Sequence, residues 1–371
     1  MKNKYALMIG AGNIGRGFIG QLFCQWGFPV VFSDVKPTLV AQLNRFREYP
    51  VVQLTETAET TYTVKNVRAI DGTDFDAVAR AVAGASIAAV SVGVKALASV
   101  APALAGGLSL RCDNNAPPLN ILICENLLDA QAYIKSLLYP LLSNRCRAYF
   151  SMNTGLVETS VGRMIPVQTA AMRAVHPLAV FAEAYCELPA DRAAFKGGAP
   201  EYPHLKPYTP FTFYVQRKMF VYNMGHSAAA YLGMRKGYEF IWQAVEDRAI
   251  RDTVRAAMKE SCAALSRAWN EDFTELNAYA EDLLRRFGNR KLMDTVERVG
   301  RDLPRKLGDN ERFFGAAGLC EKQNVNCPAI RACIRAALGL TGGEELSPLK
   351  LHGLADQKIL ALNKQASEDN A

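Results

Sequence analysis

Apolar and polar positions give the two parts of the chain different patterns. In the first part, short and almost wholly apolar runs at 5–9, 29–33, 86–92 and 119–124 alternate with longer amphipathic stretches. Such runs are typical of buried strands in a parallel sheet, with helices between them. From residue 213 onward the apolar positions follow a helical period, and we expect helices at 213–233, 239–268, 272–287, 291–301, 328–339 and 356–367. The sequence therefore predicts an α/β domain followed by a mostly α-helical domain.

The length of 371 residues also favours two domains, because one hydrophobic core rarely serves so long a chain. A segment rich in prolines, at 167–213, separates the two patterns, and we place the boundary inside it, near residue 190. The first domain, 1–190, contains period-two alternation between 46 and 70, which predicts a β insertion. The second domain covers 191–371.

A glycine-rich motif follows the first expected strand. Residues 10–15 read Gly-Ala-Gly-Asn-Ile-Gly and lead into an apolar helix at 18–24. This strand–loop–helix context is that of a Rossmann-type dinucleotide-binding domain. Gly10 permits the tight turn, Gly12 lets the backbone approach a pyrophosphate, and Gly15 lets helix and strand pack closely. The residues of this loop that we expect to bind the cofactor are Gly10, Gly12, Asn13, Ile14 and Gly15.

The end of the second strand indicates which dinucleotide binds. Asp34 falls 19 residues after Gly15, about where a carboxylate accepts hydrogen bonds from the adenosine ribose. Because a carboxylate repels a 2′-phosphate, Asp34 favours NAD over NADP, although the nearby Lys36 keeps NADP open. Val92 and Gly93, at the end of a later strand, are expected beside the nicotinamide ribose.

Polar residues also follow the strongest expected strand, at 119–124. Glu125 and Asn126 come directly after it, at the edge of the sheet where ligands bind. Asn126 has two interpretations, a substrate-binding amide or the N-cap of a helix at 127–138. The sequence leaves both open.

In the second domain, three polar residues occur within a stretch that is otherwise apolar and is expected to be helical. Lys218, Asn223 and His226 are interspersed with methionine, phenylalanine, valine and tyrosine. On an α-helix, Asn223 lies about 140° and His226 about 80° around the axis from Lys218, so all three share one half of the helix. An ammonium held among apolar side chains is easier to deprotonate and can act as a base. The alternative is that Lys218 reaches solvent and His226 is a hydrogen-bonded core histidine.

Four cations occur within nine residues in the second half of the helical region. They are Arg298, Arg301, Arg305 and Lys306. Guanidinium groups match the geometry of phosphate, so this run can bind an anion. A solvated helix face is the other interpretation.

Composition narrows the function classes. The net charge of +7 suits an anionic substrate or cofactor, but no block of like charges suggests a nucleic-acid partner. No uncharged apolar run is long enough for a membrane span, and we expect no membrane partner. Nine scattered cysteines without a CxxC pair favour reduced thiols in a cytoplasmic protein over a zinc site or disulfides.

Together these motifs resemble the polyol-specific long-chain dehydrogenase/reductase family, the mannitol dehydrogenases. The resemblance spans about residues 4 to 340, and four stretches carry it: the glycine motif extended to Gly20, Cys-Glu-Asn at 124–126, Lys-x4-Asn-x2-His at 218–226, and 296–301 with 305–307. The third pattern, placed after an N-terminal GxGxxG, is specific to this family.

The resemblance implies an NAD-dependent and metal-independent oxidoreductase. Lys218 matches the family's general acid/base, and His226 matches the histidine that orients the substrate. Asn126 and Asn223 match the amides that polarise the carbonyl oxygen. The implied reaction is the reversible oxidation of mannitol 1-phosphate to fructose 6-phosphate. The residues expected to bind this substrate are Arg163, Arg301, Arg305 and Lys306.

The chain departs from the family pattern at two places. Gly162 stands where the family commonly has an aspartate, and Val215 and Gln216 stand where a carboxylate often precedes the lysine. The alternatives are therefore a dehydrogenase of an unphosphorylated polyol or of a hexuronate such as tagaturonate, or a catalytically impaired nucleotide-binding relative. We expect a small-molecule partner, and either a monomer or a small homo-oligomer.

Overall fold

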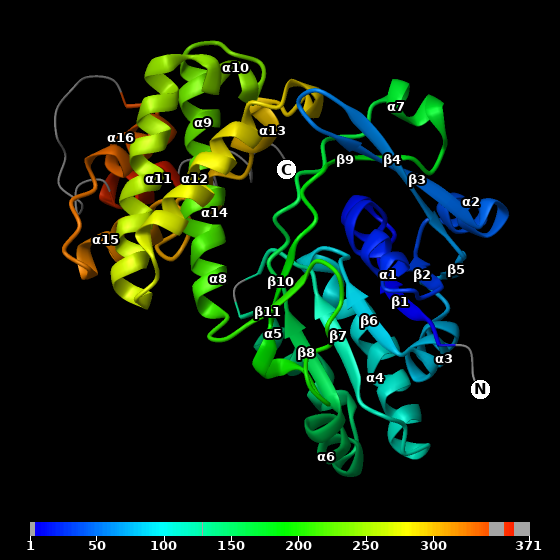
Figure 1. Cartoon of the computed structure of the whole chain (residues 1–371). Coiled ribbons are helices and arrows are strands. Elements are labelled where there is room, and N and C mark those ends of the chain that lie inside the picture. Colours follow the sequence, from blue (N-terminus) through cyan, green and yellow to red (C-terminus); the bar gives the residue numbers. More distant parts are fainter. Residues whose placement is uncertain (1–3, 128, 341–351, 360–371) are drawn as a thin grey trace, which may run out of the picture. The chain divides into compact units, whose positions relative to one another are not determined.

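The chain divides into two compact units (Figure 1). The computed structural model describes residues 4–127, 129–340 and 352–359. Unit 1 is Met1–Phe211 and unit 2 is Thr212–Ala371. The division falls after the boundary expected near residue 190, because β10 (Leu188–Asp191) and β11 (Leu205–Tyr208) pair with each other inside unit 1.

Unit 1 is built on a six-stranded parallel sheet in the order β5-β2-β1-β6-β7-β8. Its strands are β1 (Ala6–Ile9), β2 (Val30–Asp34), β5 (Val67–Asp71), β6 (Ile87–Val90), β7 (Leu119–Ile123) and β8 (Thr154–Glu158). Counted within this sheet alone, the order is 3-2-1-4-5-6, that of a Rossmann-type fold. The predicted fold of this domain is confirmed.

Both faces of the sheet are covered, which explains why its strands read as continuous apolar runs. Leu7 and Ile9 pack on one face and Ala6 and Met8 on the other, in two separate core clusters. The first cluster holds α3 (Phe75–Gly84), α4 (Leu97–Asp113), α5 (Ala130–Leu138) and α6 (Asn144–Asn153). The second holds η1 (Gly15–Gly20) and α1 (Gln21–Gln25). The remaining short helices are α2 (Pro37–Phe46), η2 (Val94–Ala96), η3 (Tyr139–Leu141), α7 (Ala170–Val175) and η4 (Arg192–Ala194).

The β insertion expected at 46–70 forms only in part. β3 (Glu48–Leu54) and β4 (Glu59–Lys65) make an antiparallel hairpin, which β9 (Val180–Glu183) extends by pairing with β3. The last residues of the expected insertion form β5 instead. Because Val67 and Ala69 are buried, β5 joins the main sheet beside β2.

The described part of unit 2 is helical and contains no strand. Its elements are α8 (Thr212–Arg217), η5 (Lys218–Asn223), α9 (Met224–Arg235), α10 (Ile241–Glu246), α11 (Arg248–Trp269), α12 (Phe273–Phe287), η6 (Arg290–Leu292), α13 (Val296–Gly300), α14 (Leu303–Lys306), α15 (Phe314–Lys322) and α16 (Pro328–Leu338).

Three of the helices expected in unit 2 differ in extent. The one expected at 291–301 is replaced by η6 and α13, which are separated at residues 293–295. The one expected at 239–268 is interrupted at Asp247, whose carboxylate caps α11 by accepting from the amide of Ile250. Of the one expected at 356–367, residues up to 359 are helical and the rest lie outside the described residues. None of the described helices combines the length and the apolar composition needed to cross a bilayer.

Among the described residues, two segments are π-helical turns, η1 in unit 1 and η5 in unit 2. Such turns close with hydrogen bonds from residue i to residue i+5. In η1, side chains from elsewhere in unit 1 bond two backbone carbonyls. The Tyr49 hydroxyl donates to the Arg16 carbonyl over 2.9 Å, and an Arg163 Nη1–H donates to the Gly17 carbonyl over 2.8 Å. These contacts hold the widened turn that follows the glycine loop.

We expect Tyr49→Phe to destabilise unit 1. The substitution removes the hydrogen bond from the hydroxyl to the Arg16 carbonyl in a part-buried setting, so the free energy of unfolding should fall by about 1 kcal/mol. Urea unfolding measures this change. Tyr133→Phe, at an exposed tyrosine on α5, is the control and should change little. Equal effects of the two substitutions would contradict the role given to Tyr49.

Candidate functional site

The glycine loop lies between β1 and the helix that follows it, and its glycines meet different surroundings. Gly10 has a φ of 96°, and a side chain there would collide with the Ser91 carbonyl. A side chain at Gly15 would collide with the Gly10 carbonyl, whereas nothing lies within 4 Å of a Cβ placed at Gly12. Gly10 and Gly15 therefore allow backbone contacts, and Gly12 keeps the loop open to a ligand.

A cavity of about 420 Å³ lies at the carboxyl ends of β1, β2 and β6. The residues around it include Gly10, Gly12, Asp34, Lys36, Ser91 and Val92. From β1 the chain adds β2 and β5 on one side of the sheet and then β6, β7 and β8 on the other, so the strand order reverses at β1. In doubly wound folds, ligands bind at the carboxyl ends of the strands where this reversal occurs. The volume of the cavity is typical of a small-molecule site. Unit 1 thus has a preformed cavity where a dinucleotide is expected.

Asp34 stands at the rim of this cavity, and the backbone holds its carboxylate in place. One oxygen accepts from the amide of Ala11 over 2.8 Å, and the other accepts from the amide of Lys36 over 2.9 Å. Since each carboxylate oxygen can accept more than one hydrogen bond, both remain able to bond sugar hydroxyls. The carboxylate is thereby oriented before any ligand binds.

Glu125 orders the loop after β6. Its Oε1 accepts from the amides of Val92 over 2.7 Å and Gly93 over 2.9 Å, so the backbone donors of these two expected cofactor residues are engaged. Desolvation raises the pKa of Glu125, and the two hydrogen bonds offset this only in part. The sequence predicted Glu125 at the ligand-binding edge of the sheet, but it did not indicate that its carboxylate would bond the backbone after β6.

Asn126 does not cap a helix. α5 begins at Ala130, with Asp129 at its N-cap position, so the N-cap interpretation of Asn126 is wrong. The first-turn amide of Gln131 donates instead to Glu158, over 2.8 Å. Asn126 is an exposed amide just past the carboxyl end of β7.

The other residues expected to bind ligands in unit 1 lie in different settings. Asn13 is exposed on the first helical turn, and Ile14 packs against the core. Arg163 is buried, and its guanidinium donates to the carbonyls of Glu183 and Gly17 over 2.7 and 2.8 Å. These contacts give Arg163 a structural role, and we do not carry it into the substrate site.

In unit 2, the π-helical turn changes the expected geometry of Lys218 and Asn223. The amide of Met224 donates to the carbonyl of Met219, five residues earlier, so residues five apart lie about one turn apart. Lys218 and Asn223 therefore stand nearly above one another rather than about 140° apart as on an α-helix. The Asn223 amide also lies 3.6 Å from the Met219 sulfur. Both residues are half-buried.

His226 is buried one turn further on, in α9. Its ring stacks on Phe287 with centroids 4.7 Å apart, and its Nε2 lies 3.1 Å from Oδ2 of Asp294. Desolvation alone would raise the pKa of Asp294, but contacts with His226 and Arg298 outweigh it and lower the pKa. Sequence reasoning missed Asp294, since no spacing rule links it to a residue 68 positions earlier.

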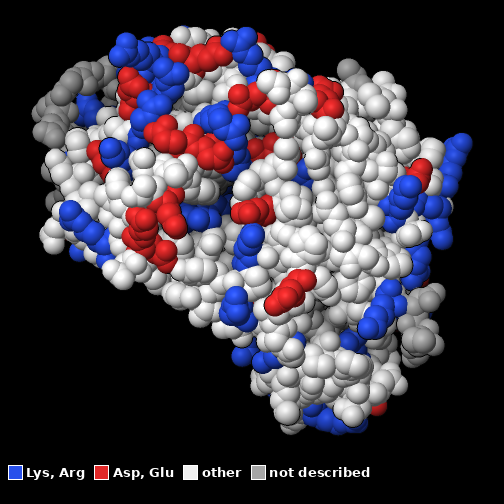
Figure 2. All heavy atoms as spheres, viewed as in Figure 1, with Lys and Arg blue, Asp and Glu red and all other residues white. Residues whose placement is uncertain are grey.

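The basic residues expected to bind an anion differ in their exposure to solvent. Arg301 forms an exposed ion pair with Glu297 at 3.1 Å, and Arg305 pairs with Asp302 and Glu311. Lys306 is buried. On the face drawn in Figure 2, acidic and basic side chains of unit 2 are interspersed.

Lys306 is the most perturbed of these cations. Its ammonium donates to the carbonyls of Val299, over 2.6 Å, and Arg301. Desolvation, followed by the charges of Arg312 and Arg305, lowers its pKa to about 8. A binding anion would offset both effects, so Lys306 and its neighbours form a candidate anion site.

Arg312 also belongs to this cluster, although the sequence did not indicate it. It is buried, pairs with Glu311 at 3.2 Å, and has an Nη1–H that donates to the Ser227 hydroxyl over 3.3 Å. Arg312 contacts Ser227, which is 85 residues away in the sequence. This contact depends on tertiary packing, which a local sequence pattern cannot predict.

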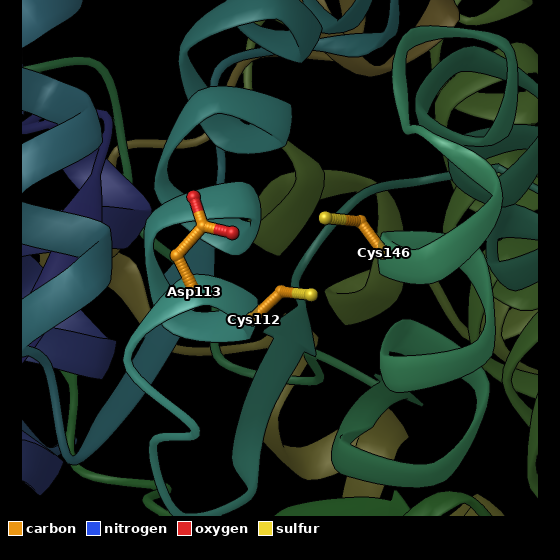
Figure 3. A group of neighbouring side chains, drawn as sticks. All are labelled: Cys112, Asp113 and Cys146. Carbon is orange, nitrogen blue, oxygen red and sulfur yellow. The ribbon is translucent and has the colours of Figure 1, made fainter.

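Cys112, Asp113 and Cys146 have potential metal-ligating atoms that all lie within 4.8 Å of one another (Figure 3). They lie where α4 ends and α6 begins. α4 starts after the carboxyl end of β6 and ends before β7, so this group is at the opposite edge of the sheet from the cavity. Asp113 also pairs with Arg145 at 3.6 Å. We assign this group no part in the reaction.

The sheet order, glycine loop and cavity have the arrangement of a dinucleotide-binding α/β protein. Two family models match the chain: the mannitol dehydrogenase Rossmann domain over residues 4–204 and the mannitol dehydrogenase C-terminal domain over residues 211–369. The chain therefore belongs to the mannitol dehydrogenase family, and the expected resemblance is confirmed.

Two bacterial relatives are similar over nearly the whole chain. Mannitol-1-phosphate 5-dehydrogenase of Brevibacillus brevis is 34% identical over 93% of this chain and 88% of its own length. The Bacillus subtilis enzyme of the same name is 34% identical, over 95% of this chain and 92% of its own length.

Solved structures with the same fold are more distant in sequence. Pseudomonas fluorescens mannitol 2-dehydrogenase, in a ternary complex with NAD and D-mannitol, matches with a TM-score of 0.75 at 16% identity, over 97% of this chain and 87% of that one. A D-sorbitol dehydrogenase matches with a TM-score of 0.75 at 14% identity, over 99% and 94% of the two chains.

We expect Lys306 to make the stability of unit 2 depend on pH. The folded-state pKa of about 8 lies below the ordinary 10.5, so between these values the unfolded chain binds this proton more tightly than the folded chain. The free energy of unfolding should therefore rise with pH over that range, by up to about 3 kcal/mol relative to Lys306→Met.

Urea unfolding of both proteins near pH 7.5 and pH 10 measures this difference. Lys259→Met, at an exposed lysine on α11, is the control and should differ from the wild type by the same amount at both pH values. A Lys306→Met difference that is also constant would show that the ammonium is not destabilised by burial.

Proposed function

We propose that this protein catalyses the NAD-dependent, reversible oxidation of mannitol 1-phosphate to fructose 6-phosphate. The observation that carries the proposal is the similarity, at 34% identity over more than nine-tenths of the chain, to two mannitol-1-phosphate 5-dehydrogenases. The residues described in each unit suit the parts of this reaction.

NAD suits the cavity of unit 1. The open backbone at Gly12 can approach a pyrophosphate, and the preoriented carboxylate of Asp34 can accept from ribose hydroxyls while repelling a 2′-phosphate. Bound NAD supplies the hydride acceptor for alcohol oxidation. The loop braced by Glu125 borders the same cavity through Val92.

Proton transfer is assigned to Lys218. As the carbon–hydrogen bond breaks with loss of hydride, the neutral amine of Lys218 takes the hydroxyl proton, and the carbonyl double bond forms. Asn223, about one π-helical turn away, is suited to donate to the oxygen on which negative charge develops. Asn126 is assigned the same kind of donor role, and His226 orients the substrate.

The phosphate group is assigned to the cations around Lys306. Arg298 is held by the buried carboxylate of Asp294 through two contacts of 2.6 Å, whereas Arg301 and Arg305 pair with the exposed carboxylates of Glu297 and Asp302, which an anion can replace. The proposed anion-binding residues are therefore Lys306, Arg301 and Arg305. We also propose a cytoplasmic location, because nine thiols outside any disulfide suit a reducing compartment. Either a monomer or a small homo-oligomer is compatible with this function.

The substrate assignment is tested by comparing the rates of NADH oxidation with fructose 6-phosphate, unphosphorylated fructose and tagaturonate. We expect a strong preference for the phosphate ester. Activity on fructose alone would keep the mechanism but remove the phosphate site, and activity only on tagaturonate would indicate a hexuronate enzyme. Inactivity with all three would overturn the proposed function.

We expect Lys218→Ala to lower kcat by about 10³-fold or more, because the general acid/base is lost. The affinity for NADH, measured by fluorescence titration, should stay nearly constant because Lys218 lies outside unit 1. Lys259→Ala serves as the matched control and should keep full activity. Normal turnover of Lys218→Ala would remove this lysine from the mechanism.

We expect Asp34→Ala to weaken the discrimination between NADH and NADPH, since the substitution removes the charge that repels a 2′-phosphate. The ratio of kcat/KM values for the two cofactors measures it. The result should be a lower ratio, caused by poorer use of NADH and better use of NADPH. An unchanged ratio would assign discrimination to other residues.

A further inference from the structure

We propose that Asp294 is the positioning residue for His226: its carboxylate keeps a proton on Nε2 of the imidazole and thereby reserves Nδ1 for the substrate hydroxyl. This inference rests on the orienting role given to His226 in the proposed function. It adds a residue that the sequence motif Lys-x4-Asn-x2-His does not contain.

The backbone fixes the position of Asp294. It lies between η6 and α13, its carbonyl accepts from the amide of Ile241 over 2.9 Å, and the next residue, Thr295, caps α13 with its side chain. Only 8% of the Asp294 side chain is exposed. The carboxylate is therefore buried, and the segment that carries it is hydrogen-bonded to α10 and leads directly into α13.

The imidazole of His226 has little freedom to turn away from this carboxylate. Its ring stacks on Phe287 at an interplanar angle of 10°, and the Tyr222 ring lies 5.9 Å away. Asp294 approaches the edge of the ring, at 3.1 Å from Nε2. Aromatic packing thus fixes the plane of the ring, and the carboxylate distinguishes its two nitrogens.

Arg298 occupies the other side of the carboxylate. Its Nε and Nη2 both lie 2.6 Å from Oδ1 of Asp294, while Oδ2 faces His226. A guanidinium partner favours the ionised carboxylate in a buried place, where an unpaired charge would be unfavourable. The arrangement keeps Asp294 an acceptor toward the histidine.

The protonation of Nε2 follows from the inventory of donors and acceptors. Nε2 of His226 and Oδ2 of Asp294 are both buried and lie 3.1 Å apart, and apart from this contact neither atom has a hydrogen-bonding partner among the described residues. An unprotonated Nε2 would place two lone-pair atoms 3.1 Å apart, which is repulsive. With Nε2 protonated, the neutral ring has an unprotonated Nδ1, which can accept from a hydroxyl.

The test combines ¹⁵N NMR of the histidines with kinetics on the full-length protein. The chain has four histidines, so comparison with His226→Gln assigns the His226 signals. We expect a protonated Nε2 in the wild type. In Asp294→Asn the side-chain amide can donate to Nε2, so the proton should move to Nδ1. kcat with fructose 6-phosphate should fall by about 10²-fold, with little change in NADH affinity.

Asp247→Asn is the matched control. It neutralises another carboxylate of unit 2, paired with Lys236 at 2.7 Å, and should leave both the His226 signals and kcat unchanged. A wild-type Nε2 without a proton would overturn the inference, and this measurement does not depend on whether Asp294→Asn folds. Unchanged signals or unchanged kcat in folded Asp294→Asn would overturn it too. Absence of wild-type activity would instead refute the proposed function, because the NMR result stands without turnover.

Discussion

The register of the helix from Thr212 to Arg235 is the constraint on which the proposed chemistry depends. A single π-helical turn at Lys218–Asn223 brings residues five apart about one turn apart, which an α-helix would place about 140° away from each other. The turn therefore aligns an amine with an amide, while α9 continues to carry His226 into the core of unit 2. A second π-helical turn, η1, follows the glycine loop of unit 1, where Tyr49 and Arg163 bond its carbonyls. Such turns are rare and frequently mark functional sites, and both of these lie at the segments given a function.

Unit 2 also contains several buried charged side chains, and each of them has a partner that offsets the free-energy cost of burying the charge. Asp294 lies between His226 and Arg298, and the Lys306 ammonium donates to two backbone carbonyls. A buried charge is unfavourable unless it is paired or hydrogen-bonded, so this density of buried polar groups is expected where a protein binds or reacts rather than where it only packs. The exposed ion pair of Arg301 contributes little to stability and leaves that side chain able to exchange partners.

The sequence patterns predicted those parts of the structure that depend on interactions between residues close together in the chain. The apolar run at β1, the glycines after it and the carboxylate of Asp34 follow from strand burial and loop sterics, and the Rossmann-type sheet follows from their order. The sequence does not show which strand pairs with which, so β5 was assigned to an insertion although it completes the main sheet. Periodicity also cannot distinguish a π-helical turn from an α-helical one over six residues. Asp294 and Arg312 reach their partners through tertiary packing, and Arg163 proved to be buried against η1.

The central claim is that a lysine, rather than a metal ion, manages the proton of the reacting alcohol. The most direct measurement is kcat with fructose 6-phosphate and NADH after exhaustive dialysis against a strong chelator, with the residual metal content determined on the same sample. If Lys218 is the general acid/base, protein with far less than one metal ion per chain retains full activity, and added zinc or magnesium does not increase it. Activity that disappears on chelation and returns in proportion to added divalent metal would contradict the claim.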